Sequence, residues 1–583
     1  MRPAALALAV LMVLLAGVVP AGMGILRAFR TDEVEFTDGK VLRGSVLSET
    51  AEGVRLATDG KTVDGMPGEV REVRRASAWS GAHVAKALGD PFTWEVLGWT
   101  AGIALLGALG AVLLGLPFAV LTARTDVPGR GFFSAFYAAP LVLPPLLTAM
   151  AWDAVLPAEW RQTPGALGAL GPALQASALF ALAYFPFVAL FARRSLAAVG
   201  ASEEEAALLA AGPWRALRRV TLPLARPGIL LGALFAFVFC LNDFSVVDYL
   251  NLFSDAKRQV PVFPYLIQIE FSRHTKTVED LLALGLPLTL LSLGIAIAAV
   301  SLATRTPTAT VGGSWRPPRP IPLGPAGRFA GALFCGAVLA AGALVPAAAL
   351  LFEAGGPSTY ARVFGQGGAQ GSLRLTLGVA AAATLMAAPA ALVLAEAGRR
   401  LGRGAEGFLG ALALLPLALV PALVPLGSMF LWNRPSLALT RDGVPWNPVY
   451  DTAVLPALVV FSRVFPFALG AAWAALREVE PSQHDAAEVT GVPWDLRLRK
   501  VLLPLVRPGV ALGALLAFVF AVRELDALAV LGSDTLVHRL WAALHFRRDE
   551  TVAAMAVVLL ALLGFAFGAA AATGWLRPRV PKP

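Results

Sequence analysis

Residues 222–228 read Leu-Pro-Leu-Ala-Arg-Pro-Gly, and residues 503–509 repeat them as Leu-Pro-Leu-Val-Arg-Pro-Gly. Each copy leads into a similar apolar stretch, Gly-Ala-Leu-Phe-Ala-Phe-Val-Phe at 232–239 and Gly-Ala-Leu-Leu-Ala-Phe-Val-Phe at 513–520. Internal symmetry of this kind is typical of transporters built from duplicated membrane units, with a pathway between the units. The repeat therefore predicts two lobes in parallel orientation.

Long apolar stretches predict that both lobes cross a membrane. The 583 residues are 57% hydrophobic and 15% charged, too little charge for the surface of a soluble protein of this size. A helix needs roughly 20 apolar residues to cross a bilayer. Candidate spans lie at 4–26, 96–122, 132–156, 173–192, 228–250, 279–303, 329–352, 372–397, 407–432, 452–475, 509–531 and 551–574. We expect an all-α polytopic membrane protein with two six-helix lobes and about twelve transmembrane helices.

Charge and composition divide and orient the chain. Basic residues concentrate in alternate loops, which predicts a cytoplasmic N-terminus and C-terminus in a bacterial inner membrane. The net charge of +9 is explained by these loops, so we expect the lipid bilayer and no nucleic acid as a partner. The expected segments are 1–29 (a first transmembrane helix, or alternatively a cleaved signal-like segment), 30–80 (an extracytoplasmic insertion), 90–303 (first lobe), 304–328 (a Pro/Gly/Arg-rich cytoplasmic linker) and 329–576 (second lobe).

Residues 30–80 interrupt the hydrophobic pattern. Short runs of alternating polarity, such as 69–73, are separated by Asp38-Gly39 and Asp59-Gly60, which are hairpin turn signals. We predict a small β-rich, barrel-like insertion outside the membrane. A disordered loop is the alternative, and the regular alternation argues against it.

The loop before the second repeat resembles a motif of binding-protein-dependent ABC importer permeases. That cytoplasmic motif is Glu-Ala-Ala, three residues, Gly, nine residues, an aliphatic residue, one further residue and Leu-Pro. The residues that fit this spacing are Asp485, Ala486, Ala487, Gly491, Val501, Leu503 and Pro504, with Asp in place of Glu. The resemblance covers nearly the whole chain except residues 30–80, which depart from the family pattern.

The first-half loop fits the motif in two ways. Counting back from Pro223 puts Glu204 at the Glu position, with Glu205 and Ala210 replacing the second residue and the glycine. Starting from Glu205, Ala206 and Ala207, with Gly212 as the glycine, makes the loop one residue short. Both alignments stay open. An ordinary amphipathic interfacial helix is the alternative to a coupling role, but two copies at equivalent positions favour coupling.

The resemblance implies the partners and the substrate. Permeases of this family place each such loop in a groove of an ATPase, so we expect two copies of a separate ABC ATPase and a soluble extracytoplasmic substrate-binding protein. The segment 124–130, the proline-rich segment 139–145, Asn242-Asp243-Phe244 and Arg523-Glu524-Leu525 resemble the iron(III)-type branch. Iron(III) is the first expectation for the substrate, with thiamine and organophosphonates transported by relatives in that branch.

Two carboxylates occupy equivalent positions in the repeat, Asp243 and Glu524. They are expected about two turns or more into the fifth helix of each lobe. A charge inside a membrane is costly and usually faces a cavity or a partner helix. We predict that both line or gate the translocation pathway. The alternative is a structural ion pair, with Arg523 or Arg463 as the cation.

Other functions have less support. The sequence contains no phosphate-binding loop, no clustered histidines or cysteines and no catalytic constellation. We therefore expect no enzyme activity, metal or cofactor on this chain, with ATP bound by the partner subunit. An ion-coupled secondary transporter is the main alternative, since many have twelve helices, but it gives no reason for two matched cytoplasmic loops. A membrane enzyme ranks last.

Overall fold

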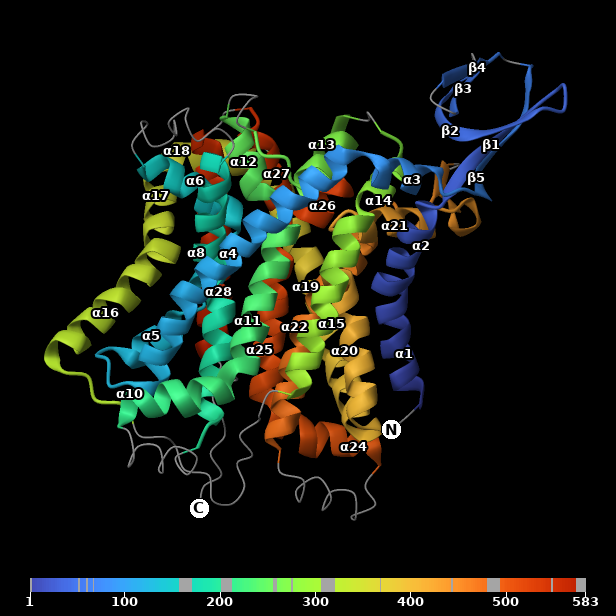
Figure 1. Cartoon of the computed structure of the whole chain (residues 1–583). Coiled ribbons are helices and arrows are strands. Elements are labelled where there is room, and N and C mark those ends of the chain that lie inside the picture. Colours follow the sequence, from blue (N-terminus) through green and yellow to red (C-terminus); the bar gives the residue numbers. More distant parts are fainter. Residues whose placement is uncertain are drawn as a thin grey trace.

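A bundle of long helices makes up most of the chain, with a small sheet at one end (Figure 1). The computed structural model describes residues 3–50, 53–58, 61–66, 68–156, 170–200, 212–254, 259–273, 276–305, 320–366, 368–441, 444–479, 493–546 and 549–572. The helix α1 (Pro3–Val13) begins at the end of the bundle opposite the sheet. This arrangement separates the sheet from the N-terminal end of the first helix by the length of the bundle.

Nine continuous helical stretches among the described residues are long and apolar enough to span a membrane. Several join two α-helices through a π-helical turn. They are α1–η1 (Leu14–Val18)–α2 (Val19–Arg27), α4 (Pro91–Arg124), α8 (Leu170–Ala198), α10 (Pro213–Ala216)–η4 (Leu217–Thr221)–α11 (Leu222–Asn242), α16 (Pro325–Leu339)–η6 (Ala340–Leu344)–α17 (Val345–Glu353), α19 (Ala369–Leu401), α22 (Val454–Glu478), η9 (Leu498–Leu502)–α25 (Leu503–Val522) and α28 (Asp549–Ala572).

Three further candidate spans are bent. The pairs are α5 (Arg130–Phe136) and η2 (Ala139–Val142) with α6 (Pro145–Val155), bent by 96°; α14 (Val278–Leu284) with α15 (Leu286–Arg305), by 43°; and α20 (Arg403–Ala418) with α21 (Leu423–Trp432), by 97°. Counted as one span each, they raise the total among the described residues to twelve, in agreement with the predicted number. The two sharp bends contain Pro144-Pro145 and Pro421. The residue before a proline avoids the α conformation, which interrupts the helix at these points.

Prolines also explain the four π-helical turns within the spans. Pro20, Pro223, Pro346 and Pro504 each stand in the first turn of the helix that follows such a turn. A proline donates no backbone hydrogen bond and clashes with the carbonyl of the preceding turn. The wider π-helical turn accommodates both effects and lets the span continue. Pro223 and Pro504 therefore stand in the first turns of α11 and α25.

The fifth span of each lobe differs from the prediction. The predicted spans 228–250 and 509–531 cross breaks in the helices, because α11 ends at Asn242 and α12 (Ser245–Leu252) follows, while α25 ends at Val522 and α26 (Asp526–Val530) follows. Asp243 and Glu524 therefore lie in the breaks rather than well inside a helix. Hydropathy averaged over a window does not detect a break that a single polar side chain caps.

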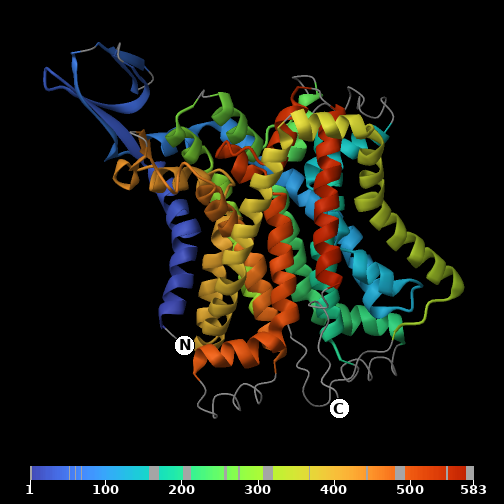
Figure 2. The same cartoon turned by 180° about the vertical axis from the view of Figure 1, so that it is seen from behind.

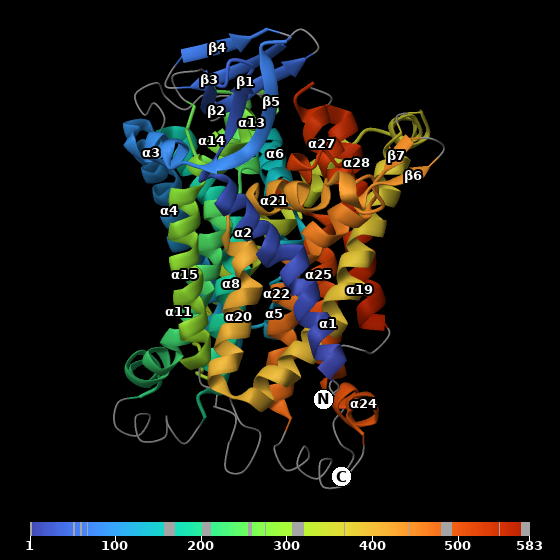
Figure 3. The same cartoon turned by 90° about the vertical axis from the view of Figure 1, so that its right-hand side faces the viewer.

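The two lobes are built from equivalent helices. In the first lobe α4, α8 and α11 pack against one another, and α19, α22 and α25 do the same in the second. The first helix of each half packs against the other half: α1 and α2 contact α19 and α21, whereas α16 and α17 contact α4, α5 and α6. Figure 2 shows yellow-green α16 beside cyan α5, and Figure 3 shows α2 beside α21. The lobes are therefore interlocked by exchanged helices.

The predicted β-rich insertion is an antiparallel sheet in which β1 to β4 form a meander and β5 returns to pair with β1. Its strands are β1 (Arg30–Phe36), β2 (Val41–Thr50), β3 (Gly53–Thr58), β4 (Lys61–Gly65) and β5 (Val70–Trp79), in the order β4-β3-β2-β1-β5. Val34, Val54 and Leu56 form its buried centre. Gly39 has φ 83°, the left-handed conformation expected of a hairpin turn. The other predicted turn, Asp59-Gly60, lies outside the described residues.

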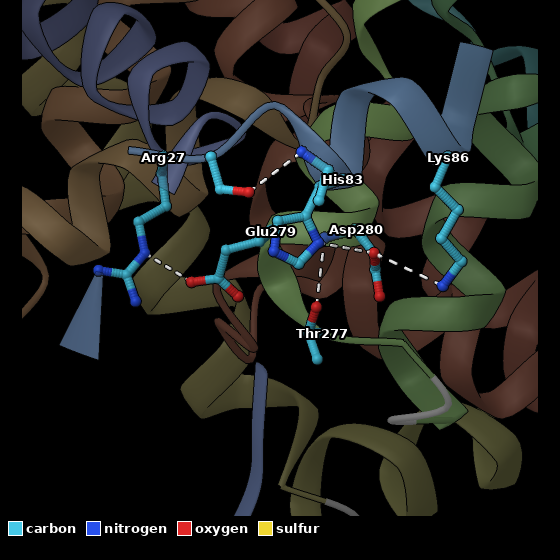
Figure 4. A network of polar contacts seen from close by, with 8 residues as sticks. Arg27, His83, Lys86, Thr277, Glu279 and Asp280 are labelled. Carbon is cyan, nitrogen blue, oxygen red and sulfur yellow. Dashed lines mark hydrogen bonds and ion pairs between the residues drawn. The ribbon is translucent and has the colours of Figure 1, made fainter. Parts of the chain in front are cut away.

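A polar junction anchors the base of this insertion to both lobes (Figure 4). Arg27 of α2 donates to Glu279 of α14 at 2.6 Å and stacks over the Phe430 ring of α21 at 4.7 Å. His83 of α3 (Ala82–Gly89) contacts Asp280 at 2.9 Å. The connecting segments on both sides of the sheet are thus held against α14.

Two further helices and one hairpin complete the sheet end. They are α13 (Phe263–Arg273), α27 (Leu536–Leu544) and the hairpin of β6 (Leu439–Arg441) with β7 (Val444–Trp446). At the opposite end lie α10 and α24 (Trp494–Arg497), one from each lobe (Figure 1).

Candidate functional site

The break after α11 is organised by the Asp243 carboxylate. One oxygen accepts hydrogen bonds from the backbone N–H of Ser245 at 2.9 Å and from its hydroxyl at 2.7 Å, which caps the start of α12. The other oxygen accepts a hydrogen bond from the hydroxyl of Tyr184 at 2.8 Å. Tyr184 belongs to α8 and is 1% exposed. Asp243 therefore joins α8, α11 and α12.

The break after α25 uses Glu524 in the equivalent way. Its Oε1 accepts a hydrogen bond from the backbone N–H of Ala527 at 3.2 Å and lies 2.7 Å from Nε of Arg463 on α22. Arg463 is 5% exposed. Of the two cations considered as structural partners of this carboxylate, Arg463 is thus the one that contacts it.

Arg523 contacts the other lobe. It donates a hydrogen bond to the backbone carbonyl of Leu141 in η2, and its guanidinium stacks 5.0 Å from the centre of the Phe520 ring. It is buried, at 9% exposed. The guanidinium group of Arg523 in the second lobe therefore has its hydrogen-bond acceptor in the first lobe, and this hydrogen bond links the two lobes.

Both carboxylates line one cavity between the lobes. The cavity has a volume of about 50 Å³. Its polar lining residues are Tyr184, Asn242, Asp243, Ser245, Arg463, Arg523, Glu524 and Asp526. Asp526, the first residue of α26, lies 4.0 Å from Arg463. The cavity thus holds three carboxylates and two guanidinium groups in the interior of a membrane bundle, where ionisable groups usually mark a functional pathway.

Four phenylalanines pack together beside this cavity, and two of them, Phe239 and Phe520, line it. Phe467 and Phe520 stack at 4.2 Å between ring centres with planes 5° apart, and Phe187 and Phe239 stack at 4.8 Å. The stacks meet, with Phe239 5.7 Å from Phe520. We call these four residues the phenylalanine cluster. Phe239 and Phe520 each precede a cavity carboxylate by one helical turn, so the cluster forms an apolar layer beside the charged one.

The phenylalanine cluster has a repeated signal in the sequence that was not among the predicted site residues. Phe-Pro-Phe occurs at 185–187 in α8 and again at 465–467 in α22, so Phe187 and Phe467 are equivalent, as Phe239 and Phe520 are. Tyr184 and Asp526 were also missed. Neither stands in a repeated motif, so only their positions around the cavity identify them.

The predicted ATPase-coupling loops are described only in part. Glu204, Glu205, Ala206, Ala207, Asp485, Ala486, Ala487 and Gly491 lie outside the described residues. Gly212 has φ 76° and precedes Pro213 at the start of α10, a backbone conformation that suits glycine. The coupling role therefore stays a prediction.

No group of three or more His, Cys, Asp or Glu side chains that could hold a metal ion occurs among the described residues. Cys240 and Cys335 are both buried free thiols.

Comparison with known proteins agrees with the duplicated architecture. A family model described as "Binding-protein-dependent transport system inner membrane component" matches residues 111–306 and again 387–582. Over 191 residues the chain is 29% identical to the molybdenum transport system permease protein ModB of Escherichia coli K12, covering 31% of this chain and 81% of the relative. ModB of Azotobacter vinelandii is 33% identical over 159 residues, covering 24% and 67%.

A third relative comes from a different uptake system. The diacetylchitobiose uptake system permease protein NgcG of Streptomyces coelicolor is 30% identical over 192 residues, covering 33% of this chain and 58% of the relative. Each alignment is about as long as one matched unit, and the family model matches twice. This chain is an inner-membrane transport subunit that carries two copies of the binding-protein-dependent transport system inner membrane component and belongs to that family.

Proposed function

We propose that this chain supplies both transmembrane lobes of an ATP-driven importer and that its solute passes through the cavity that contains Asp243 and Glu524. Two copies of a separate ABC ATPase would bind the loops around Glu204 and Asp485. A soluble binding protein would deliver the solute at the end that carries the sheet. With both lobes on one polypeptide, one chain per complex suffices.

The observation that supports this proposal most strongly is the charged cavity between the lobes. A charge in a membrane interior is unfavourable unless it is paired or hydrated, and ionisable residues kept there usually have a function. Here five ionisable side chains from both lobes line one cavity, and an apolar layer of equivalent phenylalanines lies beside it. A polar chamber with a removable apolar barrier is what alternating access requires.

ATP would act through the end of the bundle that carries α10 and α24. When the two ATPase subunits close on ATP, they draw the coupling loops of the two lobes together. Because α11 and α25 continue directly from these loops, this movement changes the contacts within the phenylalanine cluster. The ATPase and the loaded binding protein thereby bias the equilibrium between inward-facing and outward-facing arrangements.

The substrate we propose is a small inorganic ion. The motif resemblance implies iron(III), whereas two of the relatives named above are molybdenum permeases. The cavity has carboxylates that attract cations and guanidinium groups that attract oxyanions, so both remain candidates. Selectivity in this proposal comes from the binding protein.

Uptake into vesicles tests the proposal. The chain would be reconstituted with a candidate ATPase and binding protein, and ATP-dependent uptake of radioactive iron(III) citrate and of radioactive molybdate would be measured. Accumulation of either ion that requires ATP and all three proteins supports the importer. Accumulation driven by a proton gradient without ATP would instead identify a secondary transporter, which the buried carboxylates alone would also suit.

A further inference from the structure

A second contact between the lobes lies on the sheet side of the cavity. The helices α12 of the first lobe and α27 of the second both start at the cavity, which Ser245 and Val537 line. One turn further along, the indole N–H of Trp541 donates to Oδ2 of Asp248 at 2.6 Å. The Trp541 ring also packs edge-on against Phe244 at 5.9 Å between ring centres. Figure 1 places both helices at the end opposite α10 and α24.

A histidine completes this contact. Nε2 of His545 lies 3.4 Å from the same oxygen of Asp248, and Nδ1 lies 3.0 Å from the backbone carbonyl of Trp541. Both ring nitrogens thus face hydrogen-bond acceptors. A neutral imidazole can donate from only one nitrogen, whereas the imidazolium ion donates from both. The geometry of the closed contact therefore fits the protonated form of His545.

We propose that Asp248, Trp541 and His545 form the outer gate of the permease, and that protonation of His545 holds this gate closed. The proposal rests on the proposed function, because a gate has meaning only for a transport pathway. The phenylalanine cluster is the inner barrier of the same cavity, so the solute passes between two contacts that open in turn.

The electrostatics give the direction of the pH effect. The hydrogen bond to Asp248 is the main cause that raises the pKa of His545 above its ordinary value, against an opposing effect of burial. A raised pKa in the closed state means that protonation stabilises closure. The stabilisation is complete below the ordinary imidazole pKa of about 6.5 and is lost as the pH rises through the raised value. His545 is 32% exposed in its side chain, so external protons reach it.

Neighbouring charged groups have their own contacts. Asp153 of α6 accepts a hydrogen bond from Tyr249 of α12 at 3.0 Å, and Arg539 of α27 lies 3.5 Å from Asp534. On α28, Glu550 accepts a hydrogen bond from Thr359 at 3.4 Å.

Two groups remain close to the gate itself. Burial, together with the negative charge of Asp248, raises the pKa of Tyr265 on α13. Tyr265 is therefore a neutral phenol between pH 5.5 and 8.5, the range used in the experiment below. Burial lowers the pKa of His538, which stacks on Trp541. His538 is therefore neutral over most of the range from pH 5.5 to 8.5. Its substitution serves as a matched control for substitution of His545.

Distance measurement tests the gate without any substrate. Spin labels would be placed at Leu252→Cys and Phe546→Cys, two exposed positions near the ends of α12 and α27. The full chain without these cysteines controls for labelling of the buried native thiols. We expect the label separation to lengthen by about 2 Å or more, the size of the loop and domain rearrangements seen in a minority of protein complexes on binding, as the pH rises from 5.5 to 8.5.

Variants test whether the pH response of the label separation comes from His545. His545→Gln should remove the pH response and His538→Gln should retain it. Asp248→Asn keeps an oxygen for Trp541 but loses the charge, so the transition should move down toward pH 6.5. A separation that is independent of pH in the parent chain, or a response that persists in His545→Gln, overturns the inference.

Uptake in the reconstituted system separates this inference from the proposed function. ATP-driven uptake of iron(III) citrate or molybdate should be slower at external pH 5.5 than at 8.5, and His545→Gln should abolish the difference. If no uptake occurs but the label separation responds to pH, the proposed function fails and the protonation-dependent contact stands. If uptake occurs and the separation does not respond, the gate is refuted and the permease stands.

Discussion

Replacing Phe520 with Ala removes one ring from the inner barrier. Phe520 is 6% exposed and contacts three other rings of the phenylalanine cluster, at 4.2 Å from Phe467, 5.7 Å from Phe239 and 6.2 Å from Phe187. Two of these rings, Phe239 and Phe187, belong to the first lobe. Much of the contact that Phe520→Ala removes is therefore contact between the two lobes. The substitution should therefore weaken closure of the barrier more than it weakens either lobe.

The magnitude follows from the contacts. An aromatic pair contributes about 0.5–1.5 kcal/mol beyond the area it buries, and two such pairs join Phe520 to the first lobe. Truncation of a buried phenylalanine to alanine costs about 3–5 kcal/mol in all. If about 3 kcal/mol of this cost falls on closure of the barrier, the substitution raises the equilibrium ratio of molecules with an open barrier to molecules with a closed barrier by roughly 100-fold.

Leakage through vesicles measures this effect. Vesicles that contain the chain alone, without ATP, would be loaded with radioactive rubidium or radioactive molybdate, and efflux would be followed for each ion. Phe565→Ala is the matched control, because Phe565 is 77% exposed on α28. We expect Phe520→Ala to leak at least one of the ions and Phe565→Ala to leak neither. Equal leakage from two folded variants would refute the assignment of the cluster as a barrier.

Three further changes test the packing and the pathway. Glu524→Gln should lower the melting temperature in detergent, because it removes the nearer of the two carboxylates beside the buried Arg463, at a cost of up to about 3–5 kcal/mol, and adding Arg463→Met should restore much of the loss. Gly427→Ala should loosen the exchanged first helix and expose it to protease, since the new Cβ would lie 1.8 Å from the Pro20 carbonyl oxygen, and an unchanged digestion pattern would contradict that packing. Asp243→Asn should impair ATP-driven uptake while the amount of folded chain in the membrane stays the same; loss of folded chain would assign a structural role instead.

The span pattern and the repeat could be predicted because both depend on residues close together in sequence. A helix long enough to cross a membrane is visible as an apolar stretch, and the copies at 222–228 and 503–509 align without gaps. The short strands of the insertion were visible for the same reason, as alternating runs between turn residues. These features need no knowledge of distant contacts.

The breaks and the exchanged helices could not be predicted in this way. The helix break at Asp243 depends on one capping interaction with Ser245, which hydropathy does not register. The packing of α1 and α2 on the second lobe depends on close approaches such as that of Gly427 to Pro20, between residues far apart in the chain.

The site shows the same division. Asp243 and Glu524 could be named because they occupy equivalent positions in the repeat and are charged inside apolar stretches. Their partners could not, because Tyr184 and Arg463 reach them from other helices. Arg523, which stands next to Glu524 in the sequence, donates to Leu141 in the other lobe instead.

Co-purification of the chain with candidate ABC ATPase subunits tests the central claim most directly. The intact chain would be compared with a variant that carries both Glu204→Lys and Asp485→Lys, which reverses the charge of each proposed coupling loop. We expect an ATPase to co-purify with the intact chain, with two copies per chain, and to be lost from the variant. Failure of the ATPase to bind either form would contradict ATP-driven transport and favour an ion-coupled carrier.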